Sequence, residues 1–337
     1  MMSKVSVIIA AYNCRQTIGQ AIESAQGQTL SDIEIVVVDD ASTDGTYELV
    51  QSLAIADARI KALRLPKNGG PGAARNAAIG FAAAEWIAVL DADDWYKPRR
   101  LEAILKAATD LQADLVCDNL KIYDHAREEI IDETRHGNKY EVTPLTPEYL
   151  CRRDTPLNRH AIGYLKPMVR KEFLRAHGVA YNQQYRAGED FMFLMEILLN
   201  GGRGYVIPEA LYVYRHRISP TTRKISPHSR SDSGFEFAIR GCDDLMQKYS
   251  ASMSREAREA LQYKRWVFES RIMCGDMIDD LRQRKPLEAA RILARRPFIL
   301  ALMAATIVKW INANILIIWP RIKPINANMH KKDRNNI

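Results

Sequence analysis

The chain has 337 residues, enough for one large domain with an appendage or for two domains, and 47% hydrophobic and 26% charged residues are ordinary for a globular protein. The formal net charge of +7 suits an anionic ligand or membrane surface but is too small to indicate a nucleic-acid-binding protein. The five cysteines are scattered without a CxxC pair, which argues against structural zinc and indicates reduced thiols in the cytosol.

The first third of the chain alternates between expected strands and helices. Strands are expected over residues 4–11, 32–40, 59–65 and 87–90. A helix is expected over 15–26, a second runs from the 41–46 turn to about residue 56, and two more begin near residue 73 and at 97–98. Asn13 is a candidate N-cap for the first helix. This alternation predicts a parallel, right-handed, doubly wound sheet covered by helices on both faces.

The pattern of elements changes in the middle of the chain. Strands are expected over 113–118, 163–170, 203–207 and 210–215, an antiparallel strand within 119–133, a loop over 135–160 with a short helix near 147–151, and a helix opening at 186–190. From about residue 226 the chain is charged and helical, with helices expected over 229–249, 252–284 and after Pro286, and with a polar, disordered tail over 326–337.

Three carboxylates, Asp91, Asp93 and Asp94, follow the fourth expected strand directly. Like charges so close together repel one another, and a hard cation between them would relieve the repulsion. Mg²⁺ and Mn²⁺ prefer oxygen ligands of this kind and complete their coordination with substrate phosphates. The pattern therefore predicts a metal site beyond the carboxyl ends of the strands, with a solvated acidic turn as the alternative.

Asp39 and Asp40 end the second strand, where a carboxylate could accept a hydrogen bond from a base ring or a ribose; alternatively Asp40 caps the next helix. The glycine-rich stretch 69–72 fails as a dinucleotide fingerprint because it lacks the third glycine and lies outside the first βα turn. Its glycines could let the backbone approach a ligand closely. Arg75 would then contact that ligand, unless it is an exposed arginine at a helix start.

Glu189 and Asp190 lie at an expected helix N-terminus. One of them could be a general base that deprotonates an attacking hydroxyl, or both could simply be favourably placed in the helix dipole. The segment 214–222 is basic and rich in hydroxyls, so it could close over a pyrophosphate, and His216 could reach the metal. A solvated loop is the alternative for this segment.

Together these stretches resemble the family 2 glycosyltransferases with the GT-A fold. The resemblance covers about residues 3–225 and is carried, in order, by VSVIIAAYN, VVVDDASTDGT, NGGPGAARNAAIG, WIAVLDADDWYKPRRL, AGEDFMF and YVYRHRISPTT. A finer resemblance, to enzymes that assemble bacterial exopolysaccharides including the succinoglycan type, is carried by RHAIGYLKPMVRKEF, the length and the basic C-terminus.

The resemblance implies a mostly parallel α/β sheet flanked by helices, with a helical C-terminal extension. A GT-A domain would span 1–225, with a nucleotide-sugar half over about 1–118 and an acceptor half over about 119–225, followed by a helical region over 226–325. The implied reaction is inverting transfer from a UDP-sugar, UDP-glucose or a similar hexose, to a saccharide that is lipid-linked. Mg²⁺ or Mn²⁺ would be the cofactor.

The resemblance also implies roles for single residues. Asp40 would bind the uracil ring, and Asp91, Asp93 and Asp94 would form the DxD region. Asp93 is the first choice for a direct metal ligand. Asp190 is the preferred base, although Glu189 stays open. The implied nucleotide-sugar contacts are Ala10, Tyr12, Asp39, Asp40, Arg75, Asp91, Ala92 and Asp93, and the implied metal ligands are Asp93, Asp94 and His216.

Two other functions remain open at this point. A Mg²⁺-dependent phosphatase with an aspartyl nucleophile also carries a DxD motif after a strand, but on its first strand and followed by Gly-Thr or a similar pair. Here the motif follows the fourth expected strand and continues with Asp94 and Trp95. A nucleotide-sugar-binding protein without turnover is the second alternative.

The run 298–319 is the most apolar in the chain and long enough to cross a bilayer, but Lys309, Asn312 and Asn314 interrupt it. It could be an in-plane amphipathic anchor, a helix packed on the catalytic domain, or a true span. A lipid-linked acceptor would place the protein in the cytoplasm, in peripheral contact with the inner face of the cytoplasmic membrane.

Overall fold

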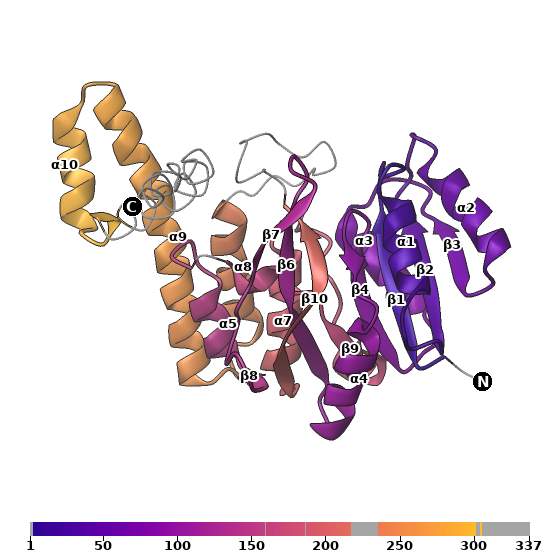
Figure 1. Ribbon diagram of the computed structural model, residues 1–337. Coiled ribbons are helices and arrows are strands. Elements are labelled where there is room, and N and C mark those ends of the chain that lie inside the picture. Colours follow the sequence, from indigo (N-terminus) through magenta and orange to yellow (C-terminus); the bar gives the residue numbers. More distant parts are fainter. Residues whose placement is uncertain (1–2, 159, 186, 217–234, 301–303, 305–337) are drawn as a thin grey trace, which may run out of the picture.

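The computed structural model describes residues 3–158, 160–185, 187–216, 235–300 and 304 (Figure 1). A ten-stranded mixed sheet carries the fold, in the order β3-β2-β1-β4-β9-β6-β10-β5, with β7 paired to β6 and β8 paired to β10. Figure 1 shows β1–β3 at one end of the molecule and the C-terminal helices α8–α10 at the other. This arrangement is the predicted helix-flanked α/β sheet with a helical extension.

The N-terminal part of the sheet is parallel, as predicted. Its strands are β1 (Val5–Ala11), β2 (Ile33–Asp39), β3 (Ile60–Arg64) and β4 (Trp86–Asp91), and its helices are α1 (Ile18–Gln26), α2 (Thr46–Ala56), α3 (Pro71–Phe81) and α4 (Arg100–Asp110). Ala11 pairs with Asp39 and Ala10 with Asp91, so the acidic ends of β2 and β4 flank the end of β1. The topology thus gathers the acids at one edge.

The second part of the sheet is mixed. It contains β5 (Trp95–Tyr96), β6 (Leu115–Asp124), β7 (Glu129–Glu133), β8 (Thr143–Leu145), β9 (Met168–Arg170) and β10 (Gly204–Arg215), with α5 (Pro147–Arg153), a 3-10 turn (Ile162–Tyr164), α6 (Lys171–His177) and α7 (Glu189–Leu199). β9 runs antiparallel between β4 and β6. The two strands predicted around Pro208 are one strand whose register shifts there, because proline cannot donate to the ladder.

Asn13 is not the N-cap that the sequence predicts. The first helix begins at Ile18, and Asn13 adopts a positive φ of 47°, which asparagine tolerates better than most residues. Its side-chain oxygen accepts the N–H of Thr43 at 2.7 Å, and its own N–H donates to Ser42 Oγ at 2.8 Å. Asn13 therefore ties together the loops that follow β1 and β2.

The C-terminal helices are α8 (Phe235–Lys248), α9 (Arg255–Arg282) and α10 (Pro286–Arg295). Ser254 caps α9 by accepting the N–H of Ala257 at 3.0 Å. Among the described residues, no helix combines the length and apolar character that crossing a bilayer requires. The apolar run 298–319 lies almost entirely outside the described residues, and the tail 326–337 and the segment 217–222 lie outside them completely.

A buried ion pair joins α4 to the central strands. Arg100 and Asp118 are both 0% exposed, and the Arg100 guanidinium donates to Asp118 Oδ1 at 2.8 and 3.0 Å. It also donates to the Lys166 carbonyl at 2.7 Å and lies over the rings of Tyr96 and Tyr212. This pair therefore supports the strands that carry the acidic turn.

We expect Asp118→Ala to lower the free energy of unfolding by about 3–5 kcal/mol, because the Arg100 guanidinium would stay buried without its counter-charge. Chemical denaturation of the full chain, followed by circular dichroism, measures the change. Asp110→Ala is the matched control, since Asp110 pairs with Lys106 on the surface and its loss should cost less than about 1 kcal/mol. Equal losses in the two variants would contradict the assigned role of the buried pair.

Candidate active site

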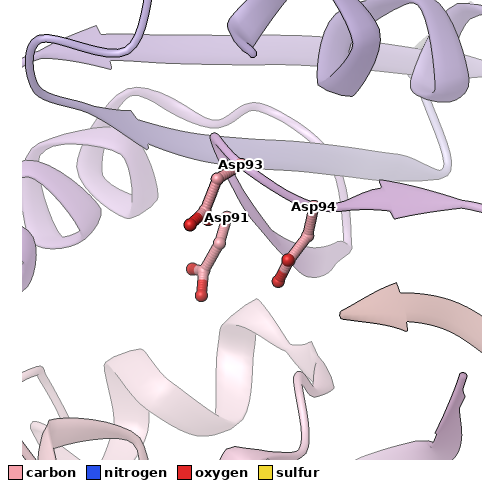
Figure 2. A group of neighbouring side chains, drawn as sticks. All are labelled: Asp91, Asp93 and Asp94. Atoms are coloured by element: carbon pink, nitrogen blue, oxygen red, sulfur yellow. The ribbon is translucent and has the colours of Figure 1, made fainter. Parts of the chain in front are cut away.

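The three carboxylates at the end of β4 and in the turn after it point toward a common space (Figure 2). One oxygen from each of Asp91, Asp93 and Asp94 lies within 4.8 Å of the others, a spacing that a single metal ion could bridge. Asp94 is only 1% exposed, and the other two are partly buried. The solvated acidic turn, which was the alternative, is therefore wrong for this stretch.

The end of β10 holds this acidic turn in place. The Tyr212 hydroxyl donates to Asp94 Oδ2 at 2.7 Å and accepts the backbone N–H of Asp91 at 3.1 Å. Arg215 donates its own N–H to Asp94 Oδ1 at 2.7 Å and its Nε–H to the Asp93 carbonyl at 2.9 Å. The turn is thus fixed by residues about 120 positions further along the chain.

Burial and the close spacing of the three carboxylates change their pKa values. Burial, together with the charge of Asp91, raises the pKa of Asp93 to about 6. Burial and the charges of Asp93 and Asp91 raise the pKa of Asp94 well above its ordinary value. Burial is the larger cause of both shifts, and the repulsion among the clustered carboxylates, which adds to it, is the part that a divalent cation would relieve. The hard oxygens of these three carboxylates fit Mg²⁺ or Mn²⁺.

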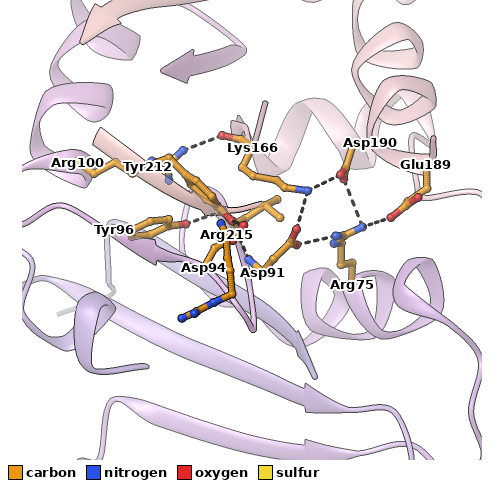
Figure 3. A network of polar contacts seen from close by, with 11 residues as sticks. Arg75, Asp91, Asp94, Tyr96, Arg100, Lys166, Glu189, Asp190, Tyr212 and Arg215 are labelled. Atoms are coloured by element: carbon orange, nitrogen blue, oxygen red, sulfur yellow. Dashed lines mark hydrogen bonds and ion pairs between the residues drawn. The ribbon is translucent and has the colours of Figure 1, made fainter. Parts of the chain in front are cut away.

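Two buried cations connect the acidic turn to the start of α7 (Figure 3). Arg75 is 4% exposed and donates to Asp91 Oδ1 at 2.7 Å and to Glu189 Oε1 at 3.0 Å. Its Nη1 also forms an ion pair with Asp190 Oδ1 at 3.3 Å. Lys166 is 3% exposed and contacts Asp91 Oδ2 at 2.7 Å and Asp190 Oδ2. The alternative of an exposed Arg75 at a helix start is therefore wrong.

The two cations determine the charge state of Asp91. Burial alone would disfavour its carboxylate, but the charges of Lys166 and Arg75 outweigh burial and hold the pKa of Asp91 below its ordinary value. Lys166 received no role from the sequence. It lies just before β9 in the stretch that carries the finer family resemblance, but that resemblance assigned no chemical role to a lysine there.

One carboxylate oxygen of Asp190 lacks a hydrogen bond in this network. Asp190 is 7% exposed, and its Oδ1 is buried and accepts no hydrogen bond from the described residues. The neighbouring Gly188 has a φ of 77°, a left-handed conformation that suits glycine, and it turns the chain into α7. Both acids lie in the first turn of α7, where the helix dipole favours negative charge.

The acids after β2 lie under the glycine-rich loop. Asp40 accepts the N–H groups of Gly69 and Gly70 at 2.7 and 2.8 Å, so it holds the loop before α3 rather than capping α2. Gly70 has a φ of 85°, which favours glycine. Asp39 accepts the Ser42 N–H at 3.0 Å through Oδ2, while its buried Oδ1 has no hydrogen-bond partner among the described residues.

The remaining predicted residues lie around the same edge of the sheet. Ala10 pairs with Asp91 in the β1–β4 register, Tyr12 follows β1 and is 41% exposed, and Ala92 is buried between the acids. His216 follows Arg215 at the end of β10, where its backbone N–H donates to the Tyr123 carbonyl at 3.0 Å. These positions are compatible with the predicted roles, which stay predictions.

Comparison with known proteins identifies the family. The sequence model of glycosyl transferase family 2 matches residues 6–187, more than half of the chain. The succinoglycan biosynthesis protein ExoO of Rhizobium meliloti is 36% identical over 266 residues, which cover 76% of this chain and 75% of that protein.

Two solved structures show the same GT-A fold. Staphylococcus aureus TarS in complex with UDP-GlcNAc is 20% identical, with a TM-score of 0.62 over 92% of this chain and 90% of that one. The mannosyltransferase PcManGT of Pyrobaculum calidifontis, in complex with GDP-Man and Mn²⁺, is 18% identical, with a TM-score of 0.54 over 95% and 88% of the two chains. The family match and the relative of similar length together establish that this chain belongs to glycosyl transferase family 2.

Proposed function

We propose that this glycosyltransferase moves a hexose from a UDP-sugar to a saccharide acceptor with inversion at the anomeric carbon. The observation that carries the proposal is the network in which Arg75 and Lys166 join Asp91 of the acidic turn to Asp190 of α7. Binding of the donor and removal of the proton need separate carboxylates within reach of one sugar, and the closeness of Asp91 and Asp190 in this network supports such an arrangement. Membership of the family removes the phosphatase alternative.

On the donor side, Asp93, Asp94 and His216 would hold Mg²⁺ or Mn²⁺, with Asp91 beside them. The ion would neutralise the charge that develops on the UDP leaving group. Asp40 would accept a hydrogen bond from uracil, with Asp39 next to it. The bound UDP-GlcNAc of TarS supports a uridine nucleotide, and the Mn²⁺ of PcManGT supports a divalent ion.

On the acceptor side, Asp190 would be the general base. Its buried Oδ1 lies 3.3 Å from the Arg75 guanidinium but accepts no hydrogen bond from the described residues, so it could accept one from an arriving hydroxyl. The proton would pass from that hydroxyl to Asp190 while the hydroxyl oxygen attacks the anomeric carbon opposite the departing UDP. One displacement inverts the centre, so no enzyme nucleophile is needed.

We assign the donor half to about residues 1–118, the acceptor half to about 119–225, and a helical region to 226–325. The ExoO name supports a role in exopolysaccharide assembly, and the hexose would be glucose or a similar sugar. A lipid-linked acceptor would bring the enzyme to the inner face of the cytoplasmic membrane. Release of UDP from a panel of UDP-sugars, with and without acceptor, tests turnover against binding alone.

Asp190→Asn should reduce sugar transfer by about 10²- to 10⁴-fold, the usual contribution of a general base. UDP affinity, measured by calorimetry, should change much less than transfer, because Asp190 itself is not among the proposed nucleotide contacts. Glu189→Gln is the matched variant and should lose much less, because only Asp190 of the two acids also contacts Lys166 beside the acidic turn. Full transfer activity in Asp190→Asn would remove Asp190 as the base.

EDTA should abolish transfer, and added Mn²⁺ or Mg²⁺ should restore it, because the clustered acids need a cation to bind a diphosphate. Asp93→Asn should raise the Mn²⁺ concentration for half-maximal UDP release by at least about 10-fold. Asp110→Asn, on the exposed face of α4, serves as the control. An undiminished rate in EDTA would argue against a metal-dependent mechanism.

A further inference from the structure

A polar cavity of about 400 Å³ lies away from the acidic turn, between β7, the chain that follows it, and the end of α5. Its lining includes Asp132, Glu133, Arg135, His136, Arg153 and His160. Figure 1 shows β7 and α5 on the half of the molecule away from β1–β3. The size is that of a small-ligand site, and the lining carries two arginines and two histidines.

His136 gives the first indication of a ligand. It is 5% exposed, its backbone N–H donates to Asn119 Oδ1 at 2.8 Å, and its ring Nε2 is buried without a hydrogen-bond partner among the described residues. Burial and the charges of Arg153 and His160 lower the pKa of His136 to about 4, so the ring is neutral near pH 7. A buried imidazole nitrogen without a partner is costly unless a bound group supplies one.

The charge balance of the cavity gives the second indication. Both of its carboxylates have partners, since Asp132 Oδ2 lies 3.0 Å from His160 Nε2 and Glu133 Oε2 lies 3.0 Å from Lys121 Nζ. In contrast, no carboxylate in the described part of the chain lies within ion-pair distance of Arg135 or Arg153. Both side chains are exposed, and the Arg153 guanidinium lies 5.7 Å from the centre of the Tyr149 ring. Planar guanidiniums that line a cavity without a carboxylate partner are suited to bind an oxyanion.

The cavity lies within a few sugar lengths of the reaction centre. His160 lines the cavity, and Lys166, only six residues later, contacts Asp91 and Asp190. Six residues span at most about 20 Å when fully extended. Between them, the Tyr164 ring lies 5.9 Å from the ring of Tyr214, on the strand that braces Asp94. The separation between the cavity and Asp190 is therefore within the length of a short oligosaccharide.

We infer that this cavity binds an oxyanion group of the acceptor saccharide, through Arg135 and Arg153, with His136 Nε2 bonded to a neighbouring hydroxyl. The inference rests on the proposed transfer to a saccharide and adds where that acceptor is held and what chemistry it carries. The oxyanion could come from an acidic sugar or from the diphosphate of a lipid carrier. Both present the same charged oxygens to the arginines.

Histidine ring ¹⁵N spectra of the full chain, with UDP and Mg²⁺ saturating the donor site, test this inference. His136→Gln identifies the His136 signals. Methyl glucuronide should shift these signals, and the neutral methyl glucoside should require an at least about 10-fold higher concentration for the same shift. Arg135→Gln with Arg153→Gln should weaken glucuronide binding by at least about 10-fold, whereas Arg175→Gln with Arg282→Gln, at two exposed arginines elsewhere, should leave it unchanged.

Farnesyl diphosphate distinguishes the two sources of the oxyanion. A shift of the His136 signals at lower concentrations than methyl glucuronide supports a lipid diphosphate, and the reverse order supports an acidic sugar. Unmoved His136 signals with both ligands, or equal binding by the Arg135/Arg153 double variant, would overturn the inference. Failure of UDP-sugar turnover would count against the proposed function alone, because the spectral readout needs no turnover.

Discussion

The site depends on two buried cations that hold carboxylates from distant parts of the chain together. Arg75 and Lys166 each contact both Asp91 and Asp190, so neither acid is buried without compensation. Removing either cation would leave negative charges facing one another in a poorly solvated place, which is far more costly than losing a surface pair. The approach of α7 to the acidic turn is therefore an electrostatic consequence of this pairing.

The sheet topology makes that pairing possible. β9 runs antiparallel between β4 and β6, and it begins just after Lys166. The Val89 N–H donates to the Pro167 carbonyl at 3.0 Å, which brings the backbone beside Lys166 close to the end of β4. On the other side, Arg100 holds the Lys166 carbonyl and lies against Tyr212, whose hydroxyl contacts the acidic turn. Stability and site geometry therefore share the same residues.

Much of this arrangement could be predicted from the sequence, because its signals are local. Apolar runs followed by acids marked β2 and β4, and the order of elements fixed the parallel part of the sheet. The acids at 91–94 and 189–190 were recognised as separate clusters, and the structure brings them together. The resemblance of the chain to the family was also visible in the sequence, since it consists of short stretches in a fixed order.

The partners of those acids could not be predicted, for a physical reason. Lys166 lies 75 positions from Asp91, and Tyr212 lies 118 positions from Asp94, so no periodic pattern relates them. Residues of this kind are selected by three-dimensional charge and hydrogen-bond balance, which a linear pattern does not encode. The unsatisfied nitrogen of His136 belongs to the same class, since only its burial distinguishes it from an ordinary loop histidine.

The two ends of α9 pack in different apolar clusters, which affects how cooperatively the chain unfolds. Ala260 and Leu261, near its start, belong to the main core, whereas Cys274 and Met277 pack with Ala289 and Ile299 in a separate small cluster. At about 1.5 Å per residue, this 28-residue helix extends roughly 42 Å, so its far end lies beyond the support of the sheet. We therefore expect the end of α9 and α10 to unfold separately from the sheet, with amides that exchange with solvent before those of the strands.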